Sequence, residues 1–131
     1  VLTDCCHIMN DLFEQKNLRI QQEFAAGSDH CQVDRDELIQ AVTNLMRNSL
    51  QSLESSSDRQ KSGRLTLRTY NQDNLLYVEV RDNGEGVKPE HQKRLFESSF
   101  TTKTPEQGTG LGLGIARRFV RGQGGDIEFV K

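Results

Sequence analysis

The sequence predicts one α/β domain over residues 1–131, in which helices lie on one side of a mixed, largely antiparallel sheet. Apolar residues recur at helical spacing in two N-terminal segments and alternate with polar residues in two later segments. The chain has 131 residues, 34% hydrophobic and 27% charged, and this length suits a single core.

The first two expected elements are a helix over 3–16 and a strand over 17–24. The helical pattern comes from Ile8, Leu12 and Phe13, which fall on one side and are expected to face the core. The strand has the sequence N-L-R-I-Q-Q-E-F, and a Gly-Ser-Asp turn follows it.

A long helix is expected over about 34–55. Asp34, followed three residues later by Glu37, forms a capping-box pattern at its start. Five apolar residues make one stripe along this helix: Leu38, Val42, Leu45, Met46 and Leu53. The stripe predicts the face of the helix that packs on the sheet.

Two strands are expected over 64–70 and 75–81, and the sequence N-Q-D-N between them predicts a hairpin. Pro89 is expected to begin a short helix over 89–95. Another helix is expected over 111–121, after which G-G-D-I-E-F-V is expected to return as a strand.

Asparagines one helical turn apart lie on the long helix, opposite its apolar stripe. At about 100° per residue, Asn44, Asn48 and Gln51 fall on one polar face. Solvated amides on an exposed surface would explain this pattern. A neutral amide oxygen also suits Mg²⁺, which keeps several waters and takes few protein ligands beside substrate phosphates. The amides alone leave both interpretations open.

The segment R-D-N-G-E-G-V, residues 81–87, follows the second strand of the hairpin. Alternation places three apolar side chains of that strand on one face: Leu76, Val78 and Val80. Asp82 continues this face, and a carboxylate there needs a partner such as the exocyclic amine of adenine. Gly84 and Gly86 would let a flat ring come close. An ordinary Asp-Asn-Gly turn is the alternative, and the phase of Asp82 favours a binding site.

The stretch G-T-G-L-G-L-G, residues 108–114, fits neither of two familiar phosphate-binding loops. The dinucleotide fingerprint needs a glycine three residues after Gly112, where Ile115 stands, and the P-loop needs a Gly-Lys pair that the chain lacks. Glycines without side-chain bulk still let backbone amides face an anion where a helix begins. A flexible linker is the alternative, but it has little use for the interleaved leucines.

Upstream of the glycines lies R-L-F-E-S-S-F-T-T-K, residues 94–103. Its two phenylalanines, Phe96 and Phe100, are candidates to anchor the base of a loop, and the T-T-K sequence is placed to reach phosphate. A polar surface loop is the alternative.

Four segments, taken in order, resemble the four sequence boxes of the ATP-binding catalytic domain of sensor histidine kinases. They are N-L-x-x-N at 44–48, D-x-G-x-G at 82–86, F-x-x-x-F-T-T-K at 96–103 and G-T-G-L-G-L-G at 108–114. That domain belongs to a family shared with DNA gyrase and MutL. The resemblance extends over almost the whole chain. It implies an α/β two-layer sandwich, the Bergerat fold, in which three helices back the mixed sheet and a mobile lid folds over ATP.

The resemblance assigns roles to individual residues. Asp82 would hold the adenine amino group, with Gly84 and Gly86 beside the base. Asn48 would bind Mg²⁺, and Asn44 would lie one turn earlier in the same catalytic pocket. Further contacts to the nucleotide would come from the lid, and these residues are Phe100, Thr101, Thr102, Lys103, Gly108, Thr109, Gly110, Leu111 and Gly112.

Asn44 distinguishes between activities within the family. In the relatives that hydrolyse ATP, a glutamate at this position activates water, and the anti-sigma serine kinases also carry that glutamate. An amide cannot act as a base, so the pocket is expected to hold ATP intact and pass its γ-phosphate to a histidine. The acceptor would lie on an upstream dimerisation hairpin, for relay to a response regulator. Phosphoryl transfer needs mainly positioning and charge neutralisation.

Some residues depart from the pattern of the family. Gln51 stands where many relatives have a phosphate-contacting lysine, and Ser98 replaces a frequent proline. None of the three histidines resembles the phosphoacceptor: His7, His30 and His91. Two alternatives therefore remain, a degenerate nucleotide-binding module that recruits a partner and an ATPase or serine kinase of the same fold.

Composition limits the partners of the domain. A net charge of −2 gives no overall attraction to nucleic acid or anionic lipid. No apolar run approaches the roughly 20 residues needed to cross a bilayer, so we expect a cytoplasmic domain without membrane contact. Cys5, Cys6 and Cys31 are expected to be reduced packing residues. The chain begins without Met and is expected to be a monomeric fragment of a longer, homodimeric protein.

Overall fold

The computed structural model describes residues 1–28, 30–54, 63–84, 86, 89–92, 95–96 and 112–130. In chain order, its elements are α1 (Leu2–Gln15), β1 (Arg19–Phe24), α2 (Arg35–Glu54), β2 (Arg64–Gln72), β3 (Leu75–Asp82), α3 (Pro89–Gln92) and α4 (Gly112–Gly122). Each lies where the sequence predicts a helix or strand. Among these helices, none is long and apolar enough to cross a membrane.

The described strands form one mixed sheet in the order β1-β2-β3. β1 is parallel to β2, and β2 is antiparallel to β3. The mixed sheet is thus confirmed, but the expectation of a largely antiparallel sheet is wrong for these strands. β1 and β2 run in the same direction because α2 connects them as a crossover helix, which parallel neighbours require.

The hairpin between β2 and β3 turns at Asp73 and Asn74. Both residues have positive φ angles, of 54° and 63°. Two left-handed residues make the type of two-residue turn whose twist matches that of the flanking strands. The predicted hairpin is therefore confirmed, with a turn two residues long.

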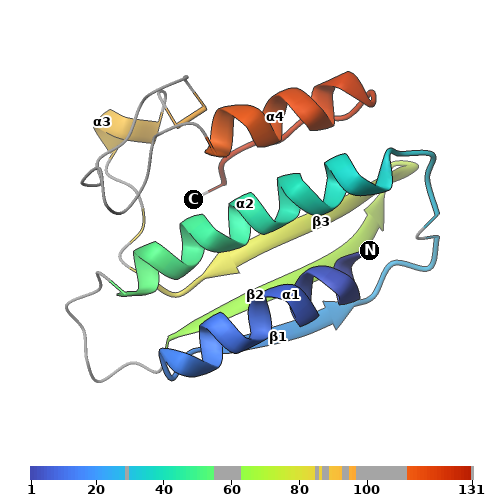
Figure 1. Ribbon diagram of the computed structural model, residues 1–131. Helices are drawn as coiled ribbons and strands as arrows, with labels where there is room; N and C mark the ends of the chain where they lie inside the picture. The colour runs from blue at the N-terminus through green and yellow to red at the C-terminus, as the bar shows by residue number, and fades with distance from the viewer. Residues whose placement is uncertain are drawn as a thin grey trace.

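Two helices cover one face of the sheet. Figure 1 shows α1 and α2 side by side on this face, whereas α4 packs against α2 and, among the described elements, contacts no strand. The expectation that three helices back the sheet is therefore wrong for the described strands. Three strands about 4.8 Å apart make a sheet that two helices, each about 10 Å across, already cover.

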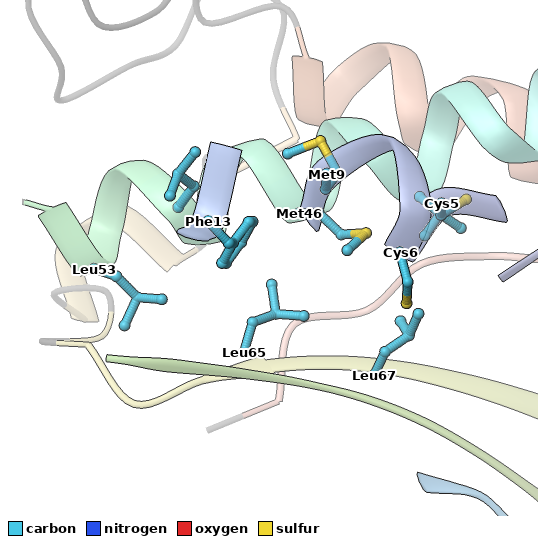
Figure 2. Close-up of a cluster of buried hydrophobic side chains, with 10 residues drawn as sticks. Cys5, Cys6, Met9, Phe13, Met46, Leu53, Leu65 and Leu67 are labelled. Carbon is cyan, nitrogen blue, oxygen red and sulfur yellow. The ribbon is translucent and has the colours of Figure 1, made fainter. Parts of the chain in front are cut away.

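The core lies between α1, α2 and β2. Its buried side chains are Cys5, Cys6, Met9, Phe13, Val42, Met46, Leu50, Leu53, Leu65 and Leu67. Figure 2 shows that the side chains of α1 and of β2 point toward one another, with those of α2 beside them. Of the predicted stripe, Val42, Met46 and Leu53 lie in this core and Leu38 packs against it. Leu45 is half-buried and lies outside the core, so this part of the prediction is wrong.

The buried side of α1 differs from the predicted one. Ile8 and Leu12 are 51% and 42% exposed. Phe13 is buried as predicted, and the residues buried with it are Cys5 and Met9, each at most 1% exposed. The prediction gave weight to the aliphatic side chains, but cysteine and methionine pack equally well inside proteins. Burial raises the pKa of the Cys5 thiol to about 11, so this thiol stays protonated. Cys31 is exposed, and its expected packing role is wrong.

The opposite face of the sheet carries polar and aromatic side chains. The rings of Tyr70 and Tyr77 stack with their centroids 4.9 Å apart. The guanidinium of Arg68 lies 4.8 Å from the centroid of the Tyr70 ring and 3.7 Å from the Glu79 carboxylate. Such cross-strand pairs stabilise an antiparallel ladder. No described helix covers this face.

The predicted strand at G-G-D-I-E-F-V is wrong, because residues 125–130 form no regular structure. The reason lies in Asp126, whose Oδ1 accepts hydrogen bonds from Nε of Arg117 at 3.0 Å and Nε of Arg121 at 2.9 Å. The same oxygen accepts the backbone N–H of Ile127 at 2.8 Å. These bonds hold the segment against α4 instead of at an edge of the sheet.

Asp126→Asn should destabilise the domain at neutral pH but not in acid. The hydrogen bond from Arg121, followed by that from Arg117, holds the pKa of the Asp126 carboxyl well below its ordinary range. A carboxyl with a lowered folded-state pKa contributes stability above its unfolded pKa of about 4, and this contribution fades as the pH falls below that value. Urea midpoints of both proteins, measured from pH 7 to pH 3, should therefore converge in acid. A constant difference would contradict the assignment.

Candidate functional site

A row of polar side chains runs along α2 on the side that faces α4. Asn44, Asn48 and Ser52 follow one another at intervals of one helical turn, and each is half-buried. The row is about 12 Å long, from the helical rise over eight residues. The amides that the sequence places on an open polar face are therefore partly enclosed, because α4 packs along this side.

One end of the row meets the first turn of α4. The side-chain amide of Asn44 donates a hydrogen bond to the carbonyl oxygen of Gly112 at 3.4 Å. A Cβ atom at Gly112 would lie 4.0 Å from Cβ and Cγ of Asn44, so the two backbones approach closely without strain. The predicted neighbours Asn44 and Gly112 are thus brought together.

Asp82 ends β3 on the face that the helices cover. It pairs with buried Leu65 of β2, and Val80 pairs with buried Leu67, which confirms the predicted phase of the carboxylate. Val78, in the same predicted row, is 40% exposed. Asp82 is half-buried, and its Oδ1 accepts the backbone N–H of Gly84 at 3.0 Å. Among the described residues, none donates a hydrogen bond to Oδ2.

The loop after Asp82 packs against the other end of the α2 row. A Cβ atom at Gly84 would lie 2.8 Å from Oγ of Ser52 and 3.3 Å from its carbonyl oxygen. Glycine is therefore required here by the close approach of α2. Gly86 is required for another reason, because its φ of +80° lies in the left-handed region.

The site thus has Asn48 in the middle, α4 at the Asn44 end and the Asp82 loop at the Ser52 end. Ser52 is the residue that the sequence reasoning missed, although extending the turn-by-turn row by one step would have found it. Phe96, the first predicted anchor, is half-buried, and the guanidinium of Arg117 lies 4.7 Å from its ring centroid.

Most of the expected lid residues lie outside the described residues: Phe100, Thr101, Thr102, Lys103, Gly108, Thr109, Gly110 and Leu111. Of the expected nucleotide-binding residues, the structure describes Asn44, Asn48, Asp82, Gly84, Gly86 and Gly112.

Gly84→Ala should lower the free energy of unfolding by about 1–3 kcal/mol, the usual cost of overpacking. The added methyl group would collide with Oγ of Ser52 and with Oδ1 of Asp82, at 2.8 and 3.0 Å. Urea denaturation would measure the loss, with Gly27→Ala as a control because no atom lies within 4 Å of a Cβ there. In a Ser52→Ala background the cost should shrink, and an unchanged cost would count against this packing.

The matched family decides the class of site. Residues 33–131 match the family described as histidine kinase-, DNA gyrase B-, and HSP90-like ATPase. The chain belongs to this family. Every described residue of the site lies within the matched range, so this polar row is part of an ATP-binding domain of the histidine kinase type.

Curated relatives of this ATP-binding domain are sensor proteins and histidine kinases. The sensor protein FixL of Bradyrhizobium diazoefficiens is 32% identical over 111 residues, which cover 85% of this chain and 21% of FixL. The sensory histidine kinase/phosphatase NtrB of Salmonella typhimurium is 32% identical over 123 residues, covering 86% of this chain and 33% of NtrB. The chain therefore spans at most a third of the length of these two relatives.

Solved histidine kinases share the fold of this domain. The catalytic domain of ThkA matches with a TM-score of 0.75 at 24% identity, over 92% of this chain and 74% of the ThkA chain. Full-length ShkA, in complex with AMPPNP, matches with a TM-score of 0.78 at 25% identity, over 94% of this chain and 24% of ShkA. The resemblance to sensor histidine kinase catalytic domains is therefore confirmed.

Proposed function

We propose that this domain binds Mg-ATP and donates the γ-phosphate to a histidine on a phosphoacceptor hairpin of the longer protein, for relay to a response regulator. The observation that carries the proposal is the half-buried row on α2 between the Asp82 loop and α4. A carboxylate stands at one end of the row, and the first turn of a helix stands at the other.

The adenine end of the proposed site is the Asp82 loop. Oδ1 of Asp82 is already bonded to the loop backbone, so its orientation is fixed before the nucleotide binds. The second oxygen would accept a hydrogen bond from the adenine amino group. Gly84 and Gly86 add no side chain beside the base, and the loop packs against Ser52 of α2 at Gly84.

The phosphate end would lie near the start of α4, where backbone N–H groups without helical partners favour anions. The amide oxygen of Asn48 is a suitable ligand for Mg²⁺, which takes few protein ligands beside phosphates. When bound, Mg²⁺ would neutralise charge on the phosphates. The lid contacts predicted from Phe100 to Leu111 remain part of this proposal.

Asn44 determines which reaction the pocket favours. Its amide donates to the carbonyl oxygen of Gly112, and an amide cannot take a proton from water. Without a base at this position, hydrolysis receives no assistance from Asn44, and the γ-phosphate remains available to an external nucleophile. Transfer to histidine is therefore favoured over the ATPase alternative. A non-catalytic module is the second alternative, and the position of the Asp82 carboxylate at the end of the polar row argues against it.

The test uses the longer protein that contains this domain and its phosphoacceptor hairpin, incubated with ATP labelled at the γ-phosphate. We expect acid-labile label on a histidine of the hairpin, little release of inorganic phosphate, and loss of labelling in Asn48→Ala. Gln40→Ala, at an exposed position of α2 outside the row from Asn44 to Ser52, is the control. Steady hydrolysis without labelled protein would support the ATPase instead. Absence of nucleotide binding would support the interaction module.

The assembly and location of the domain complete the proposal. We propose that it works in the cytoplasm as part of a homodimer joined through the phosphoacceptor hairpin. The domain alone should be a monomer, and sedimentation equilibrium would check this.

A further inference from the structure

The two helices that border the site meet again at their far ends. α2 and α4 run antiparallel (Figure 1), so the end of α4 lies beside the start of α2. The residue that joins them is Gln123. Its Oε1 accepts the backbone N–H of Asp34, and its Nε2 donates to Oε2 of Glu37 at 3.2 Å.

Gln123 completes the capping box of α2. In this motif the N-cap side chain accepts the N–H of the residue three positions on, and the side chain of that residue accepts the N-cap N–H. The first bond is present, since the N–H of Glu37 donates to Oδ1 of Asp34 at 2.9 Å. The second runs through Gln123, whose amide lies between the N–H of Asp34 and the carboxylate of Glu37.

Hydrogen bonds at the end of α4 fix the backbone conformation around Gln123. Gly125 N–H donates to the carbonyl oxygen of Val120 at 3.0 Å, and Gly124 N–H donates to that of Arg121 at 3.1 Å. Gly124 has a φ of +92°. These features make a Schellman motif in which Gln123 is the C-cap of α4. One side chain therefore links the C-cap of α4 to the N-cap of α2.

We infer that Gln123 is a positioning residue of the nucleotide site, an inference that rests on the proposed function. Asn44 and Gln123 are the described polar links between α2 and α4, one near each end of the contact. Gln123 fixes the position of α4 along α2 and so fixes where the first turn of α4 stands relative to Asn44 and Asn48. Its loss affects the phosphate end of the site and spares the Asp82 loop.

The test compares two nucleotides in competition with a fluorescent ATP analogue: a non-hydrolysable ATP analogue and AMP, which lacks the β- and γ-phosphates. In Gln123→Met the affinity for the ATP analogue should fall about threefold to tenfold, as expected for one or two lost hydrogen bonds. The affinity for AMP should stay within about twofold, since a factor of two is under 0.5 kcal/mol. Gln40→Met, at an exposed position of α2, is the matched control.

A swapped pair tests the bond itself. Gln123→Glu places its carboxylate against that of Glu37. It should lower the affinity for the ATP analogue as much as Gln123→Met does. The double variant Glu37→Gln with Gln123→Glu restores a donor facing an acceptor and should recover the affinity. The inference is overturned if Gln123→Met lowers the melting temperature but leaves the ratio of the affinities for the ATP analogue and AMP unchanged. It is also overturned if the double variant fails to recover the affinity for the ATP analogue. If the unaltered domain binds no nucleotide, the proposed function fails first, and this inference falls with it.

Discussion

Asp82→Asn should weaken the binding of a non-hydrolysable ATP analogue by about thirtyfold, or about 2 kcal/mol, as expected for a lost hydrogen bond to a charged group. Asparagine has the size of aspartate and keeps an oxygen for the N–H of Gly84, so the loop should retain its conformation. The other oxygen becomes an NH₂ group, which would face the adenine amino group donor to donor. Calorimetric titration would measure the change.

The control for this prediction is Asp73→Asn. Asp73 lies in the hairpin turn at the far end of β3, in the left-handed region that asparagine tolerates well. It should bind the nucleotide as the unaltered domain does. Equal affinities for Asp82→Asn and the unaltered domain would remove Asp82 from the site and the adenine end with it.

Phe13→Ala should lower the free energy of unfolding by about 3–5 kcal/mol, the usual cost of deleting a buried aromatic ring. Phe13 is 1% exposed and lies in the core with Met46 and Leu65. A loss of this size is a large part of the stability of a small domain. Chemical denaturation followed by circular dichroism would measure it.

Leu12→Ala provides a matched control one residue away. Leu12 is 42% exposed, so its truncation should change the free energy of unfolding by less than about 1 kcal/mol. If Leu12→Ala proved as costly as Phe13→Ala, the orientation of α1 would be wrong. Phe13→Leu, which keeps most of the apolar volume, should fall between the two.

Local signals predicted most of the elements of this domain. The hairpin turn and the bond from the N–H of Glu37 to Asp34 each depend on neighbouring residues, and both formed as expected. The phase of Asp82 followed from alternation along one strand, and the register with Leu65 confirms it. These features need only short-range chemistry, which a single sequence contains.

Features that depend on distant contacts were predicted less well. The tail at Asp126 reads as a strand by its alternation, but two arginines of α4 determine its position. α4 packs on α2 and not on the described strands. This position depends on the width of the sheet, which two helices already cover. Ser52 and Gln123 have ordinary sequence contexts, and their importance appears only when two elements come together.

The stacked tyrosines on the open face of the sheet determine how this domain can be observed. The chain has two tyrosines and no tryptophan, so the fluorescence excited in the tyrosine absorption band comes from the Tyr70–Tyr77 pair. This pair lies on the face of the sheet opposite α2, away from the nucleotide site. Tyrosine emission should therefore report unfolding of the hairpin and change little when nucleotide binds. Because the chain has no tryptophan, a single tryptophan introduced near the site would be the only one in the domain, and its emission would report on nucleotide binding.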